Sequence, residues 1–107
     1  MGGSVFSNWA VGEPPREIDR TWLRCGLDFG YAADPAAAVL AAFDRKKGTL
    51  YILEEFKQAG LTNDLLALRL KALCGTLPVT CDSAEPKSIA ELRRHGVQAL
   101  PARKGPD

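Results

Sequence analysis

The sequence predicts a single α/β domain whose sheet is built in the order βββαβαβ. Three strand-like segments rich in apolar and β-favouring residues come first, at residues 22–29, 37–43 and 49–56. Two segments with helical spacing then alternate with two short apolar segments, at 77–82 and 97–100. A hairpin-built meander followed by two right-handed crossovers produces a mixed sheet.

Length and composition restrict the class of protein. The chain has 107 residues, of which 46% are hydrophobic and 25% are charged. These values suit one globular domain and exclude disordered, collagen-like and membrane-spanning classes. Fourteen Lys and Arg residues against thirteen Asp and Glu residues give a net charge of +1. No overall field therefore attracts nucleic acid or a membrane, and an anionic ligand must be held locally.

The cysteines and the N-terminus bear on the compartment. Cys25, Cys74 and Cys81 are an odd number without C-x-x-C or metal-ligand spacing. We therefore expect neither a disulfide framework nor a zinc site, and a reducing cytosol is the simplest location. The N-terminus lacks a basic segment followed by an apolar one, and no apolar run of about 18 residues occurs, so export and membrane insertion are not predicted.

Residues 1–20 are interpreted as an N-terminal arm and residues 21–107 as the domain. Within the arm, Glu13-Pro14-Pro15 interrupts regular structure. The domain opens with the dense apolar run Trp22–Phe29, which is typical of a central strand covered on both faces. Asp28 is an acidic residue within that apolar run. The turn Asp44–Gly48 then joins the second and third strands, so that the first three strands form an antiparallel meander.

The second half contains two predicted helices. Thr62 suits the N-cap of a helix that runs to about Cys74, and Gly75 suits its end. Pro86 suits the first position of the other helix, which Gly96 ends. The apolar segments after each helix complete the order expected of a ribonuclease-H-like fold. The last residues, 104–107, look like a loop, so this fold is predicted to stop before its C-terminal helices.

Two aspartates lie where such a fold carries metal ligands. Asp28 is near the end of the first predicted strand, and Asp82 is at the end of the fourth. These strands are neighbours in the predicted topology, so both carboxylates emerge at the same end of the sheet. Phosphodiester cleavage with two metal ions needs such an acidic pair, because hard divalent ions prefer oxygen ligands. The alternative is that each aspartate merely caps a strand end or the following helix.

Longer motifs around both aspartates resemble a known family. The first is Gly26-Leu27-Asp28-Phe29-Gly30-Tyr31 followed by Asp34-Pro35, and the second runs from Asp82 to Ile89. Together with Ala102-Arg103-Lys104-Gly105, they resemble the nuclease domain of phage terminase large subunits. Gly60–Asn63 and Val5–Trp9 also match, so the resemblance covers nearly the whole chain.

The resemblance implies a Mg²⁺- or Mn²⁺-dependent endonuclease that cuts concatemeric viral double-stranded DNA during genome packaging. It makes Asp28 and Asp82 the catalytic metal ligands. The family has a third acidic residue near the end of the domain, and Asp107 is too early to be that ligand. No G-x-x-x-x-G-K-[ST] phosphate loop occurs either, so we expect a fragment or a natural truncation. The implied partners are the terminase ATPase domain, the small terminase subunit and the portal, in the host cytoplasm.

Basic residues near the acidic pair are candidates for DNA binding. Lys87, Arg103 and Lys104 lie near the predicted carboxyl end of the sheet or just beyond the fifth strand. Contacts to DNA phosphates would hold the duplex without selecting its sequence. A solvated surface is the alternative for all three.

Further acidic residues have two interpretations each. Asp34 precedes Pro35, where its side chain suits a turn or support of a metal ligand. Glu85 suits either the N-terminal dipole of the second helix or a supporting acid beside the metal. Glu54 and Glu55 suit solvated charges on an edge strand or substitutes for the missing ligand.

Two other functions use the same residues. Asp28-Phe29-Gly30 resembles the D-x-G phosphate loop of actin-like ATPases and sugar kinases, although Tyr31 and Ala32 stand where Ser or Thr is usual. A noncatalytic DNA-contacting or packaging module fits the missing third ligand and the small net charge.

Overall fold

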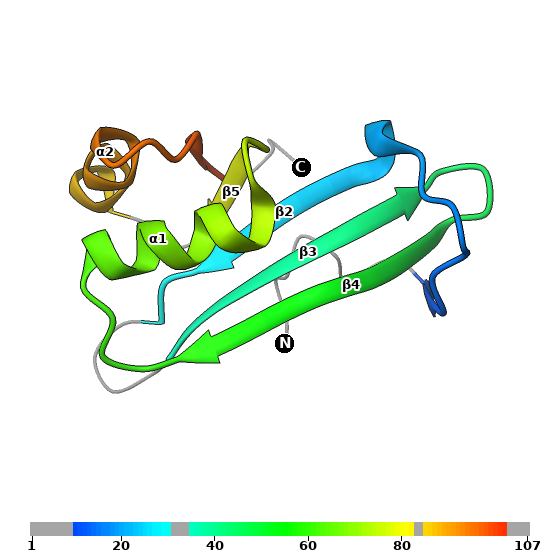
Figure 1. The fold of residues 1–107 in the computed structure, drawn as a ribbon, viewed down its shortest axis with the longest axis horizontal. Helices are drawn as coiled ribbons and strands as arrows, with labels where there is room; N and C mark the ends of the chain where they lie inside the picture. Colours follow the sequence, from blue (N-terminus) through cyan, green and yellow to red (C-terminus); the bar gives the residue numbers. More distant parts are fainter. Residues whose placement is uncertain (1–9, 31–34, 83–84, 103–107) are drawn as a thin grey trace.

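A computed structural model describes residues 10–30, 35–82 and 85–102. These residues form one mixed sheet with the strand order β1-β4-β3-β2-β5-β6 and two α-helices (Figure 1). The strands are β1 (Ala10–Gly12), β2 (Leu23–Asp28), β3 (Ala36–Asp44), β4 (Thr49–Gln58), β5 (Val79–Asp82) and β6 (Ala99–Pro101). The helices are α1 (Asn63–Cys74), α2 (Pro86–Arg94) and a short 3₁₀ turn, η1 (Arg20–Trp22).

The predicted order βββαβαβ is confirmed in β2 to β6, and the first three of these strands form the expected antiparallel meander. The turn between β3 and β4 is held by Asp44, whose Oδ1 accepts a hydrogen bond from the backbone N–H of Lys47 at 3.2 Å. Gly48 closes the turn with φ +62°, a conformation that side chains disfavour. The strand β2 is central, as predicted, between β3 and β5.

The sheet has one strand that was not predicted. Strand β1 lies within the N-terminal arm and pairs in parallel with Thr49–Tyr51 of β4. At Gly12 the two strands approach closely, because a Cβ atom there would lie 3.0 Å from Thr49 Cγ2. This strand has only three residues and little hydrophobic pattern. It is recognisable as a strand only through its pairing with β4, which is distant in the sequence.

Helix α1 begins and ends close to the predicted positions. Thr62 occupies the N-cap, but its hydroxyl donates to the Asp64 carboxylate instead of capping the backbone. That hydrogen bond lowers the pKa of Asp64, which is fully exposed. At the other end, Gly75 has φ +60° and its N–H donates to the Lys71 carbonyl at 2.9 Å, which ends the helix.

Helix α2 begins at Pro86, as predicted, with Glu85 at the N-cap position. The side chain of Glu85 makes no capping hydrogen bond. The helix is tied to the following strand by Arg93, whose Nε donates to the Ala99 carbonyl at 2.8 Å. It is also tied to α1, because Asn63 Nδ2 donates to Glu91 Oε2 at 3.2 Å.

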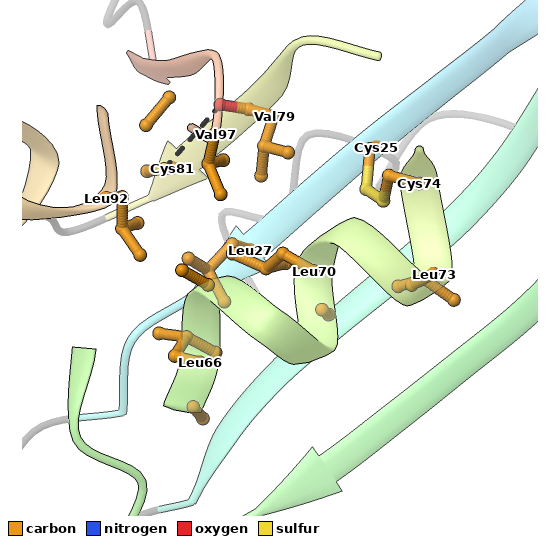
Figure 2. Packing of buried hydrophobic residues seen from close by; sticks show 14 of the residues in the cluster. Cys25, Leu27, Leu66, Leu70, Leu73, Cys74, Val79, Cys81, Leu92 and Val97 are labelled. Atoms are coloured by element: carbon orange, nitrogen blue, oxygen red, sulfur yellow. Dashed lines mark hydrogen bonds between the residues drawn. A yellow bond between two sulfur atoms is a disulfide. The ribbon is translucent and has the colours of Figure 1, made fainter. Parts of the chain in front are cut away.

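Both helices pack on the same face of the sheet, which we call the helix face. Figure 2 shows Leu66 and Leu70 of α1 close to Leu27 of β2, with Leu92 of α2 beside Val97. The buried residues of β2, β3, β5 and β6 that meet the helices alternate along their strands, as one-sided burial requires. They are Cys25, Leu27, Ala36, Ala38, Val79, Cys81 and Ala99.

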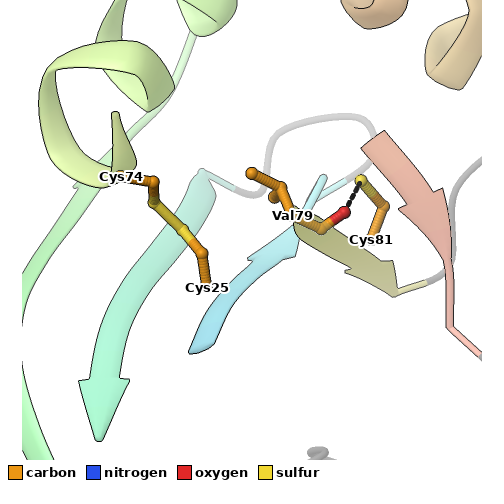
Figure 3. The surroundings of a disulfide bond; sticks show 4 residues. All are labelled: Cys25, Cys74, Val79 and Cys81. Atoms are coloured by element: carbon orange, nitrogen blue, oxygen red, sulfur yellow. Dashed lines mark hydrogen bonds between the residues drawn. A yellow bond between two sulfur atoms is a disulfide. The ribbon is translucent and has the colours of Figure 1, made fainter. Parts of the chain in front are cut away.

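The helix face also contains a disulfide between Cys25 of β2 and Cys74 at the end of α1 (Figure 3). Their Cα atoms are 6.4 Å apart, within the usual range for a bridge. The sequence analysis expected no disulfide framework from the cysteine spacing, and for Cys25 and Cys74 that expectation was wrong. The two residues are 49 positions apart and meet only because α1 lies across β2.

Cys81 is a small buried residue of the helix face. Its Sγ donates to the Val79 carbonyl at 3.6 Å (Figure 3). Burial raises the pKa of the Cys81 thiol to about 11.

The opposite face of the sheet, which we call the open face, carries neither α-helix of the described residues. Arg24 and Asp28 of β2 are exposed there and Gly26 between them is buried, so the predicted cover of both faces of this strand is complete on the helix face and partial on the open face. A β-bulge interrupts the β3–β4 ladder at Leu53 of β4. Leu40 pairs with Glu54 and Ala41 pairs with Ile52, so Leu53 has no partner in β3. The bulge changes which β4 residues face each side.

Candidate metal centre

The structure brings Asp28 and Asp82 together at one end of the sheet. They are direct partners in the parallel pairing of β2 with β5, at the last residue of each strand. Neighbouring strands lie about 4.8 Å apart, so the two Cα atoms are separated by about that distance. Because the preceding residues, Leu27 and Cys81, are buried on the helix face, both aspartates point to the open face.

The two carboxylates differ in their surroundings. Asp28 is exposed, and its Oδ1 accepts a hydrogen bond from the Gly30 N–H at 3.2 Å. The strand-end cap considered as the alternative for this residue is thus present, but it uses one oxygen only. Asp82 is half-buried and accepts no hydrogen bond from any residue of the described ranges. Carboxylate oxygens therefore remain available at the end of both strands.

This donor set fits a hard divalent cation in part. Mg²⁺ is often bound through one or two carboxylates, with waters and substrate phosphates completing the shell. Two adjacent carboxylates meet that requirement. Within residues 10–30, 35–82 and 85–102, no group of three or more His, Cys, Asp or Glu side chains could hold a metal. A site on these residues must gain its remaining ligands from elsewhere.

Two other predicted site residues, Glu85 and Lys87, lie at the N-terminal end of α2, and their roles stay predictions. Lys87 is exposed in the first turn of α2, next to the N-terminal end of that helix. Asp34, Arg103 and Lys104 fall outside the described residues, so their predicted roles stay predictions.

Glu54 and Glu55 do not join the carboxylate pair. Glu54 is opposite Leu40, whose side chain packs against the core on the helix face. Glu55 is opposite Val39 and faces the open side, but strand β3 lies between it and the strand of Asp28. Both are exposed, as expected of charges on an edge strand.

One basic residue of the open face was missed. Lys57 lies opposite Ala37, which lies opposite Asp28, so one row across the sheet contains Asp82, Asp28, Ala37 and Lys57. Alternation along β4 could have suggested that Lys57 and Phe56 face opposite sides. The bulge at Leu53 decides which side each one takes, and the sequence gives no sign of that bulge.

Comparison with known proteins agrees with this arrangement. A family described as Terminase RNAseH like domain matches residues 28–107. The chain therefore belongs to the terminase family with a ribonuclease-H-like domain. The matched range begins at Asp28 and includes Asp82, which favours the terminase assignment over the phosphate loop of actin-like ATPases.

Two curated relatives are terminase large subunits. The PBSX phage terminase large subunit of Bacillus subtilis (strain 168) is 39% identical over 90 residues, which are 83% of this chain and 21% of that protein. The large terminase subunit of Bacillus phage SPP1 is 36% identical over 89 residues, with 79% of this chain and 21% of that protein covered. The chain thus spans about a fifth of the length of these terminases.

Solved structures place the similarity in the nuclease domain. The large terminase nuclease domain from bacteriophage SPP1, crystallised with bound Mn, has a TM-score of 0.72 and 32% identity, covering 95% of this chain and 62% of that one. The P22 large terminase nuclease domain has a TM-score of 0.69 at 17% identity, covering 92% and 52%, and supports the fold alone. The ribonuclease-H-like fold class is confirmed, and the terminase chain corresponds to part of such a nuclease domain. None of the helices in the described ranges has the length and hydrophobicity needed to cross a bilayer.

Proposed function

We propose that this terminase chain is part of a Mg²⁺- or Mn²⁺-dependent endonuclease domain that cuts concatemeric double-stranded DNA during phage genome packaging. Asp28 and Asp82 would hold the metal through their carboxylate oxygens. The metal would stabilise charge on the attacking and leaving oxygens of the phosphodiester. The observation that carries the proposal is the direct pairing of these two aspartates at the ends of neighbouring parallel strands.

Three further facts support this function. The nuclease domain from SPP1, similar in fold and sequence, was crystallised with Mn. The open face beside the pair carries neither α-helix of the described residues, and Asp28 is exposed on it. Terminase large subunits act in packaging complexes, and we extend the partners to the ATPase domain, the small subunit and the portal in the host cytoplasm.

Calorimetric titration of the chain with Mn²⁺ tests the metal ligands. We expect weak binding by the parent chain, because two carboxylates leave most of the coordination shell to water. Asp28→Asn and Asp82→Asn should each abolish the signal. The matched control is Glu17→Gln. Glu17 is an exposed acidic residue before η1, outside β2 and β5, so this variant should bind Mn²⁺ as the parent does. Equal binding by Asp28→Asn and the parent would contradict the ligand assignment.

Plasmid nicking tests the chemistry. Within the described residues, no third carboxylate of the kind implied by the family resemblance joins Asp28 and Asp82. Loss of one preorganised charge interaction costs about a hundredfold or more in rate, or about 3 kcal/mol. We expect supercoiled plasmid to be nicked slowly, with Mn²⁺ and only when Asp28 and Asp82 are intact. Fast cleavage that Glu55→Gln abolishes would show that Glu55 replaces the third ligand.

A noncatalytic packaging or DNA-contacting module is the second candidate. It is favoured by the presence of only two clustered carboxylates in the described ranges. Its signature would be DNA binding by the parent chain that neither divalent ions nor Asp28→Asn alters. Metal-dependent nicking of any rate would exclude it.

A further inference from the structure

The row of directly paired residues that contains the two aspartates continues across β3 to a lysine of β4. Asp28 pairs with Ala37 of β3, and Ala37 pairs with Lys57 of β4. Directly opposed residues in a sheet point to the same face. Two interstrand spacings separate the Cα atoms of Asp28 and Lys57, or about 10 Å.

Contacts of the residues beside Lys57 confirm its direction independently. The Arg69 guanidinium of α1 lies over the Phe56 ring, with 4.5 Å between its carbon and the ring centroid. Arg69 Nη1 also donates to the side-chain oxygen of Gln58. Phe56 and Gln58 therefore both point to the helix face, so Lys57 between them points to the open face with the aspartates.

Ala37 is the residue that lies between Lys57 and Asp28 in this row. Ala37 places only a methyl group there. Lys57 is exposed, and no ion pair joins it to another residue in the described part of the chain. An ammonium group on a flexible four-carbon stem is thus free to meet an anionic ligand on the open face.

We propose that Lys57 binds a backbone phosphate of the DNA held at the Asp28–Asp82 pair, and that the duplex crosses the sheet over β5, β2, β3 and β4. This inference rests on the proposed nuclease function and adds the path of the substrate. Phosphates of one strand advance about 3.4 Å per nucleotide along the helix axis. A separation of about 10 Å therefore puts Lys57 two or three nucleotides from the phosphate at the carboxylates.

A different role for this lysine must be distinguished from phosphate binding. Among the described residues, strand β1 pairs only with Thr49–Tyr51, so the rest of β4 is an edge of the described sheet. Exposed edges commonly carry lysine, which discourages pairing with another chain. An edge lysine of this kind would affect self-association and leave DNA binding unchanged.

The experiment measures binding of the 107-residue chain to a short fluorescent duplex at a fixed low Mn²⁺ concentration and several monovalent salt concentrations. We expect Lys57→Gln to weaken binding about five- to tenfold at 0.1 M salt and to reduce the slope of log K against log salt by about 0.9, because one phosphate contact is lost. Lys57→Arg should retain the slope. The thermal unfolding midpoint should not change in either variant.

The matched control is Lys46→Gln. Lys46 is exposed in the β3–β4 turn, so the same charge is removed at the opposite end of the hairpin, roughly 25 Å from Lys57 at about 3.4 Å per strand residue. Its salt slope should equal that of the parent.

The outcomes separate this inference from the nuclease proposal. Equal slopes for Lys57→Gln, Lys46→Gln and the parent would overturn the role of Lys57, while loss of Mn²⁺-dependent binding in Asp28→Asn would still support the nuclease. A larger oligomer for Lys57→Gln with an unchanged slope would identify an edge lysine instead. Absence of any DNA binding by the parent chain would contradict both proposals.

Discussion

The two faces of the sheet use adjacent residues of the same strands for different purposes. On the helix face, Leu27 and Cys81 are buried beneath α1 and α2. One position further along, Asp28 and Asp82 project from the open face. In β4, Phe56 likewise packs towards α1 while Lys57 faces the other side. Stability and the proposed chemistry are therefore separated by a single step along each strand.

The difference implies that the two faces should respond differently to substitution. Side chains on the helix face are enclosed by helices, so a smaller residue leaves a cavity there. Asp28 and Lys57 on the open face are exposed, so a change of charge at either residue should alter binding with little effect on folding. The following experiments test this separation.

The largest effect should come from truncating a leucine of α1 that packs on the sheet. Leu70 is 1% exposed and Leu68 on the same helix is 62% exposed. We expect Leu70→Ala to reduce the free energy of unfolding by about 2–5 kcal/mol and Leu68→Ala to change it by less than about 0.5 kcal/mol. Urea unfolding followed by circular dichroism measures both. Equal losses would mean that the outer side of α1 is also packed.

Removal of the disulfide should have a slightly smaller effect. The bridge joins residues of β2 and α1 that are 49 positions apart in the sequence. Such crosslinks contribute about 2–4 kcal/mol to the free energy of unfolding, chiefly by restricting the unfolded chain. Reductant should therefore lower the unfolding midpoint of the parent chain. It should have no effect on a Cys25→Ala/Cys74→Ala variant. If thiol labelling finds three free cysteines in the folded, unreduced parent, the bridge is absent in solution.

Cys81 should make stability depend on pH in the alkaline range. Burial raises its pKa from the ordinary 9.0 to about 11, so the folded chain keeps a thiol proton that the unfolded chain loses. This contribution is complete below about pH 9 and disappears as the pH rises through 11, with about 1 kcal/mol lost at pH 10. The difference in unfolding free energy between the parent and Cys81→Ala should shrink accordingly between pH 8 and pH 10. A constant difference would show that the thiol ionises equally in both states.

The smallest effect on folding is expected at the carboxylate pair. Like charges directly opposite in a sheet destabilise it by about 0.2–1 kcal/mol. Without metal, Asp28→Asn should therefore raise the free energy of unfolding by about that amount, while Glu17→Gln leaves it unchanged. Added Mn²⁺ should raise the unfolding midpoint of the parent and not that of Asp28→Asn. A destabilised Asp28→Asn would instead give the main role to the hydrogen bond from Gly30.

Much of this arrangement could be predicted because local patterns specify it. Thr62 and Gly75 bracket α1, Pro86 begins α2, and the order of strands makes Asp28 and Asp82 neighbours. The missed features depend on contacts between distant residues. Strand β1 exists only through its pairing with Thr49–Tyr51, and the disulfide only through the position of α1 over β2. Neither partner can be chosen from composition or periodicity alone.

Leu53 is the extra residue of the β-bulge in β4, and it determines how insertions and deletions in this hairpin change the register. With this extra residue in β4, Ala37 is opposite Lys57. If the same length of chain formed a regular ladder from the turn, Ala37 would meet Phe56, the aromatic ring would face solvent and the ammonium group would enter the core. Deleting Leu53 would remove the bend and leave both residues on their present sides. A family member that lacks this residue could therefore keep the same two faces, whereas one that gained a residue here and still bulged by only one residue would exchange them.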